Sequence, residues 1–117
     1  MEQSVLNRTV VAQPSSAIAR QAGLTSEAAL NARFLMVEEE GIGQDYPFSG
    51  EKISPVLTIY RYVNFDDALD KVMRILEYQG KGHSFGIHSR DEDHIDRLTR
   101  VAQVGRVLVN QAHCIGK

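Results

Sequence analysis

The sequence predicts an α/β fold, a mostly parallel sheet with flanking helices. Short apolar runs typical of buried parallel strands alternate along the chain with segments of helical periodicity. These segments follow one another in the strand–helix–strand order of parallel α/β units. With 117 residues, 43% of them hydrophobic and 24% charged, the chain can form one domain with a real core.

The first elements are predicted from short local signals. Residues 8–12 contain the β run Thr-Val-Val. Pro14 then begins a helix that Gly23 ends, because proline suits the first helical turn and glycine the position after the last. A further helical turn is expected at 25–31. The continuous apolar run at 33–37 predicts a strand covered on both faces.

The strongest helix signal follows a strand predicted at 55–63. Asn64 is the expected N-cap of this helix, apolar residues then recur at spacings of three and four, and Gly80 ends it. The apolar stripe is interpreted as a core face without chemistry. A further strand is expected at 85–88.

The last helix and strand complete the predicted sheet. Ser89 and Glu92 match a capping box, which predicts a helix from 89 to about 103. The run Val-Leu-Val at 107–109 predicts a buried strand. Residues 110–114 would lie at its carboxyl end, where open α/β sheets place their sites.

Composition excludes several classes of function. A net charge of −2 leaves no electrostatic footprint for nucleic acid or an acidic membrane. No apolar run approaches the roughly 20 residues of a membrane-spanning helix, and the N-terminus lacks a signal-peptide pattern. The single cysteine suits a reducing compartment. We therefore expect a soluble, cytoplasmic protein that binds neither nucleic acid nor membrane.

Glu51 is the first candidate site residue. Turn-forming residues precede it, and Pro55 fits the first position of the strand that follows. The carboxylate would therefore stand at the mouth of a strand, where an ionised glutamate can accept hydrogen bonds from paired hydroxyls such as those of a ribose. The alternative interpretation is a solvated charge before a strand.

His83 is the second candidate, because it stands where the chain enters a new strand. Its imidazole could donate to an oxygen atom or activate a neighbouring thiol. The alternative is a histidine that is hydrogen-bonded to loop backbone. The surrounding Gly-Lys-Gly segment at 80–82 does not have the spacing of a phosphate-binding loop, so that assignment is rejected.

Two acidic or histidine-bearing groups invite a metal interpretation, but no metal site is predicted. The three acids at 38–40 are adjacent, so on an extended chain their side chains point to opposite faces. The second group lies around the start of the last helix, where capping already explains the acids. Its members are His88, Asp91, Asp93 and His94.

Cys114 follows His113 directly, which suggests a nucleophile and its base. Neighbouring residues on an extended strand cannot face each other, so the pair is not a catalytic dyad by itself. An ordinary free thiol near a strand end is the favoured interpretation.

Four segments resemble, in order, one protein family. They are residues 6–23, the block E-K-I-S-P-V-L at 51–57 with the preceding F-S-G, Q-G-K-G-H-S at 79–84, and R-V-L-V-N-Q at 106–111. The family is the aldehyde dehydrogenase superfamily, and within it the coenzyme-A-acylating branch of acetaldehyde, succinate-semialdehyde and sulfoacetaldehyde dehydrogenases. Residues 110–114 resemble the sulfoacetaldehyde type most.

The resemblance implies an activity and roles for three residues. Such enzymes attack a small aldehyde with a cysteine thiolate, pass hydride to NAD or NADP, and transfer the acyl group to coenzyme A. Glu51 matches the carboxylate that holds the nicotinamide ribose, and Pro55 belongs to the same cofactor-binding block. His83 matches the histidine near the catalytic thiol.

The resemblance also implies that residues 1–117 are a partial catalytic domain. The family's catalytic cysteine and most of its nucleotide-binding domain precede the matching segments, and its closing oligomerisation segment follows them. We expect the chain alone to be inactive, to bind no cofactor, and to act with its missing domain or as a homo-oligomer.

Two other functions stay open. The chain could be a non-catalytic assembly module derived from that fold, or an unrelated small α/β enzyme that uses His83 and Cys114.

Overall fold

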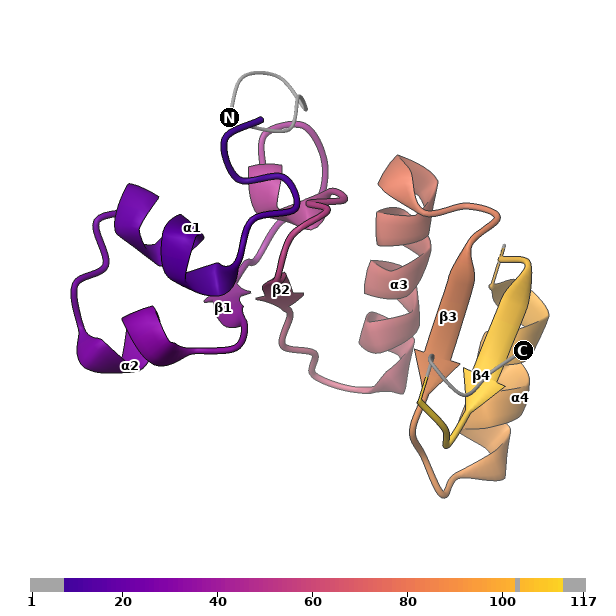
Figure 1. Cartoon of the computed structure of the whole chain (residues 1–117). Coiled ribbons are helices and arrows are strands. Elements are labelled where there is room, and N and C mark those ends of the chain that lie inside the picture. The colour runs from indigo at the N-terminus through magenta and orange to yellow at the C-terminus, as the bar shows by residue number, and fades with distance from the viewer. Residues whose placement is uncertain (1–7, 103, 113–117) are drawn as a thin grey trace. The chain divides into compact units, whose positions relative to one another are not determined.

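A computed structural model of the chain describes residues 8–102 and 104–112, and the chain divides into two compact units (Figure 1). The first unit is Met1–Arg61 and the second is Tyr62–Lys117. Each unit contains a two-stranded parallel sheet. The predicted α/β class with parallel pairing is confirmed. The single continuous sheet is not observed among the described residues, since strand pairing depends on distant partners that local patterns do not specify.

Helix α1 (Ser15–Gln21) confirms the first helix prediction. Pro14 is its N-cap residue. Gly23, with φ of 76°, follows the helix, and its N–H donates to the carbonyl of Arg20 at 3.1 Å. The N–H of Leu24 reaches back to the carbonyl of Ala19 at 2.9 Å. This pair of bonds is a Schellman motif, which explains why the helix stops here.

The strand predicted at 8–12 is wrong. Residues 8–11 form a turn, and the N–H of Gln13 closes on the carbonyl of Val10 at 3.2 Å. Ala12 has a φ of 58° and donates its N–H to the carbonyl of Ile53 at 2.8 Å. A left-handed residue ends any extended run, so three β-forming residues give an anchored turn instead of a strand.

The remaining elements of the first unit lead to its sheet. Helix α2 (Glu27–Asn31) confirms the helical turn predicted at 25–31, and its N-cap Ser26 accepts through its side chain from the N–H of Ala29. Strand β1 (Leu35–Glu38) pairs with β2 (Val56–Ile59) over their whole length. The short 3₁₀ helix η1 (Pro47–Ser49) lies in the connection between them.

The prediction that the first of these strands is covered on both faces is wrong. Leu35 and Val37 are half-buried, but Met36 between them is 61% exposed. Its register partner Leu57 is 54% exposed. Side chains alternate between the faces of a strand, so among the described residues this sheet has one covered and one exposed apolar face.

Helix α3 (Phe65–Gln79) opens the second unit as predicted. Asn64 is the N-cap and accepts from the N–H of Asp67 at 2.9 Å, while Gly80 is the C-cap. The carboxylate of Asp67 accepts in turn from Lys71 at 2.8 Å and from the N–H of Val63 at 3.0 Å. Both contacts hold the pKa of Asp67 below its ordinary value, and the hydrogen bond from Lys71 has the larger effect.

Strands β3 (Ser84–Ile87) and β4 (Arg106–Val109) pair in parallel, and α4 (Glu92–Val101) connects them. Both strands confirm the predictions. The core of this unit contains Leu76, Leu98 and Leu108, each less than a tenth exposed.

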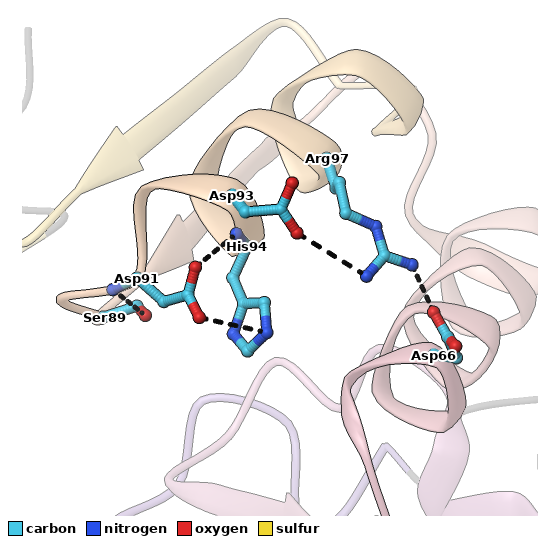
Figure 2. Close-up of polar contacts among 6 residues, drawn as sticks. All are labelled: Asp66, Ser89, Asp91, Asp93, His94 and Arg97. Carbon is cyan, nitrogen blue, oxygen red and sulfur yellow. Dashed lines mark hydrogen bonds and ion pairs between the residues drawn. The ribbon is translucent and has the colours of Figure 1, made fainter.

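The capping box predicted at Ser89 is wrong. Asp91 is the N-cap of α4 and accepts from the N–H of His94 at 3.2 Å. Ser89 instead accepts from the N–H of Asp91 at 3.0 Å (Figure 2). Aspartate and serine are N-caps of similar strength. The sequence therefore offered two possible starts, and the helix uses the later one, at Asp91.

Among the residues that the structure describes, no helix combines the length and the apolar character required to cross a membrane.

Candidate functional site

Glu51 lies in the loop between η1 and β2, with its carboxylate fixed by the loop itself. Its Oε1 accepts from the N–H of Lys52 at 3.0 Å and from the N–H of Ile53 at 3.1 Å. Ile53 has a φ of 44°, in the left-handed region. The glutamate side chain is exposed. The structure thus places a fixed, solvent-facing carboxylate shortly before a strand, as the sequence predicts.

Four further hydrogen bonds hold this loop. Ala12 donates its N–H to the carbonyl of Ile53 at 2.8 Å. The ammonium of Lys52 donates to the carbonyls of Phe48 at 2.8 Å and Gly50 at 2.9 Å. The hydroxyl of Thr58, in β2, donates to the same Phe48 carbonyl at 2.5 Å. Segments from three parts of the first unit therefore fix the backbone that carries Glu51.

Pro55 links the loop to the sheet. It stands one residue before β2, and its carbonyl accepts from the N–H of Leu35 at 2.8 Å. Because proline has no N–H of its own, only its carbonyl can extend the ladder. The predicted position at the strand entrance is confirmed to within one residue, and its part in cofactor binding stays a prediction.

Because of Lys52, the stability of the first unit should vary with pH in the alkaline range. Burial lowers its pKa below the ordinary value of 10.5, although the charge of Glu51 acts in the opposite direction. Between the lowered pKa and 10.5 the unfolded chain holds a proton that the folded chain has released, so the free energy of unfolding rises with pH there. We expect the wild type to gain stability over Lys52→Met across this window in urea unfolding. A difference that is flat or falls would contradict the burial of the ammonium.

His83 lies in the exposed turn between α3 and β3. Its Nδ1 is 3.2 Å from the hydroxyl oxygen of Ser84, the first residue of β3. Its carbonyl accepts from the N–H of Gly105 at 2.7 Å, which ties this turn to the start of β4. A Cβ on Gly105 would lie 3.1 Å from the carbonyl oxygen of Gly82, so glycine fits this close approach. The predicted location of His83 at a strand entrance is confirmed, and its catalytic role stays a prediction.

The candidate residues fall in both units. Glu51 and Pro55 share one loop of the first unit, and His83 belongs to the second. Cys114 and His113 lie outside the described residues.

Both aspartates around the start of α4, and His94, have partners other than a metal. Asp91 caps α4, and its second oxygen lies 3.4 Å from Nε2 of His94 (Figure 2). Asp93 lies 3.9 Å from Arg97, which also binds Asp66 of α3. His88 is exposed. Within residues 8–102 and 104–112, no three His, Cys, Asp or Glu side chains are placed to hold a metal ion.

The carboxyl ends of β3 and β4 are joined by one side chain. Asn110, with φ of 54°, accepts from the N–H of Ser89 at 2.8 Å and donates to the carbonyl of Ser89 at 2.9 Å. Its own N–H donates to the carbonyl of Ile87 at 2.8 Å. At the strand ends where the sequence predicted a functional site, the side-chain amide of Asn110 therefore links the end of β4 to the residues that follow β3.

Sequence reasoning missed a groove of about 240 Å³ in the second unit. The ring of His94 forms part of its wall and stacks on Phe65, with centroids 3.8 Å apart. The other walls come from α3, β3 and α4, and the full lining is Tyr62, Phe65, Ala68, Leu69, Val72, Phe85, Gly86, Ile87, His88, Ser89, His94 and Leu98. The apolar stripe of α3 gave no signal for it, because a core face and a groove wall have the same periodicity.

Comparison with known proteins identifies relatives of this chain. No protein-family model matches it. It is 49% identical over 102 residues to a sulfoacetaldehyde dehydrogenase (acylating) of Cupriavidus necator, covering 87% of this chain and 21% of that protein. A sulfoacetaldehyde dehydrogenase of an Acholeplasma species is 35% identical over 112 residues, covering 95% of this chain and 22% of the relative.

A solved structure shares the fold. The crystal structure of an acetylating aldehyde dehydrogenase from Geobacillus thermoglucosidasius matches with a TM-score of 0.89 and 34% identity, over 99% of this chain and 25% of that protein. The chain thus spans about a fifth to a quarter of the length of these relatives. The resemblance drawn from the sequence is confirmed.

Proposed function

Since this chain is homologous to one segment of the acylating aldehyde dehydrogenases, we propose that it supplies part of the catalytic domain of such an enzyme. The reaction converts an aldehyde, coenzyme A and NAD(P)⁺ to an acyl-coenzyme A and NAD(P)H. Sulfoacetaldehyde is the favoured substrate. The chain acts only together with the rest of the domain, which brings the catalytic cysteine and most of the nucleotide-binding part.

One observation carries the proposal. A relative whose name states the acylating sulfoacetaldehyde activity shares 49% of its residues with this chain over 102 positions. An aldehyde-alcohol dehydrogenase of Clostridium acetobutylicum shares 36% over 108 positions. The higher identity favours the sulfoacetaldehyde type over other aldehydes.

Glu51 is the residue that we assign to the cofactor. The loop amides orient its carboxylate, and an ionised carboxylate has acceptor capacity for roughly four hydrogen bonds, which suits a vicinal diol. NAD(P)⁺ supplies the hydride acceptor when bound. The contribution of Glu51 is to hold the nicotinamide ribose in one orientation, and Pro55 fixes the strand behind it.

His83 is assigned to the thiol chemistry. Its imidazole is exposed in the turn before β3, and Nδ1 lies beside the Ser84 hydroxyl, which can fix the ring orientation and tautomer. There it can donate to the aldehyde oxygen or take the thiol proton once another segment brings the cysteine.

The test is complementation in trans. The chain is co-expressed with the Cupriavidus enzyme from which the homologous segment has been deleted, and coenzyme-A-dependent NAD(P)H formation is measured with sulfoacetaldehyde. We expect activity from the pair and none from either part. Glu51→Gln should lower kcat/KM for the nucleotide by roughly 10- to 100-fold, since hydrogen bonds to a charged acceptor contribute about 1.5–3 kcal/mol.

Glu39→Gln is the matched control. Glu39 also accepts two loop N–H groups through Oε1, from Glu40 at 2.9 Å and Gly41 at 3.4 Å. Glutamine keeps one acceptor oxygen for the loop N–H groups at either position. At Glu39 the substitution removes the same charge where no ribose partner is proposed, so kcat/KM should stay within a few-fold of wild type. Equal losses at both positions would reduce Glu51 to a loop anchor, and an inactive but assembled pair would favour the non-catalytic assembly module.

A further inference from the structure

The sheet of the first unit has an apolar face that the other described residues of this unit leave exposed. Met36 and Leu57 are register partners on this face, 61% and 54% exposed. Phe34, two residues before Met36, is 53% exposed. We call these three residues the Met36 face. Contiguous apolar patches of this kind on a folded protein usually mark an interaction site.

The sequence of β1 is that of a strand with two covered sides. Residues 34–37 are all apolar, whereas a strand with one wet side alternates apolar and polar residues. Parallel sheets are almost always covered on both faces, and a sheet of two strands is marginally stable by itself. The sequence therefore suits a layer that this unit does not contain among its described residues.

The solved relative contains polypeptide beyond this fold. The fold of this chain recurs in the Geobacillus protein with a TM-score of 0.89 but makes up only 25% of it. In that protein the same sheet is accompanied by about three times as much further chain. Polypeptide able to cover a second face is thus a regular companion of this fold.

We infer that the Met36 face docks the remaining part of an acylating aldehyde dehydrogenase fold. This inference rests on the proposed function and names the partner of its site. Leu57 lies six residues after Glu51 in the chain, so a polypeptide seated on this face comes close to the loop that carries the carboxylate. A second copy of this chain is the less suitable occupant, because it would repeat Glu51 and would not bring the catalytic cysteine that the proposed function requires.

The experiment measures association and activity separately. The tagged chain is co-expressed with the Cupriavidus dehydrogenase lacking its homologous segment, the complex is isolated, and its dissociation constant is measured. Met36→Glu and Leu57→Glu place a charge on the face and should weaken binding by on the order of thirtyfold or more, as for a central interface residue. Leu24→Glu is the control, since Leu24 is a 45% exposed leucine of the same unit that follows α1. It should bind like wild type.

A chimeric enzyme covers the case in which the deleted partner does not fold. The chain is grafted into the full-length Cupriavidus enzyme in place of its homologous segment, with each of the three substitutions. The two face variants should then lower the melting temperature of the chimera by several degrees more than Leu24→Glu does. Equal melting temperatures, or a wild-type chain that dimerises through Met36 and Leu57 instead of binding the partner, overturn the inference.

Activity distinguishes this inference from the proposed function. A complex that forms, depends on the Met36 face and yet reduces no NAD(P)⁺ upholds the docking face and refutes the function. An active complex that tolerates Met36→Glu and Leu57→Glu upholds the function and refutes the face.

Discussion

Replacing Leu98 with alanine is expected to lower the free energy of unfolding of the second unit by about 2–5 kcal/mol. Leu98 is 2% exposed and lies on α4 in the core that also contains Leu108. The truncation removes apolar contact and leaves a cavity that adjoins the groove. Native domains are stable by only about 5–15 kcal/mol, so this single truncation should remove a large fraction of the stability.

Urea unfolding by circular dichroism, with amide exchange to assign the change to the second unit, measures this effect. Val101→Ala is the matched control, because Val101 lies on the same helix but is 40% exposed. It should change the stability by less than about 1 kcal/mol. Because alanine has the higher helix propensity at either position, similar losses at both would contradict the assignment of the effect to the buried side of α4.

Asn110→Ala is expected to have the second-largest effect on stability, about 2–3 kcal/mol. The change removes both amide contacts with Ser89. It also places alanine at a φ of 54°, a left-handed conformation that asparagine tolerates better than alanine. The carboxyl ends of β3 and β4 should then separate more readily, so the Ser89 amide should exchange faster with solvent.

Two further variants separate the two causes. Asn110→Gly relieves the backbone but keeps the loss of the side chain, so it should be less destabilising than Asn110→Ala by about 1 kcal/mol. Asn110→Asp keeps an acceptor for the Ser89 N–H and loses the donor to its carbonyl. If Asn110→Gly equals wild type, the side-chain contacts contribute nothing, and the position matters only for its backbone conformation.

The sequence predicts what local rules determine. Helix α3 is predicted from its cap at Asn64 to its end at Gly80, because capping and periodicity act within one element. The placement of Glu51 before a strand is also predicted, since turn residues and proline are local signals. Its anchoring by Ala12 is not, because that contact joins residues 41 positions apart in the chain.

The failures share a cause as well. The β run at 9–11 pairs with no strand among the residues that the structure describes, and Asp91 instead of Ser89 is the N-cap of α4. In both cases the local signal is real, and a competing contact determines the structure. The groove beside His94 could not be predicted, since it depends on how α3, β3 and α4 pack.

The left-handed backbone of Ile53 makes the Glu51 loop cooperative. A β-branched residue at a φ of 44° costs about 1–2 kcal/mol relative to an extended or helical conformation. The bonds from Glu51 and from Ala12 to Ile53 oppose its relaxation together. Loss of either hydrogen bond would let Ile53 relax and would thereby break the other. The losses of stability from removing each bond should therefore be less than additive. The orientation of the carboxylate is in this sense a collective property of the loop, and the residue that stores the strain is not the one that bears the carboxylate.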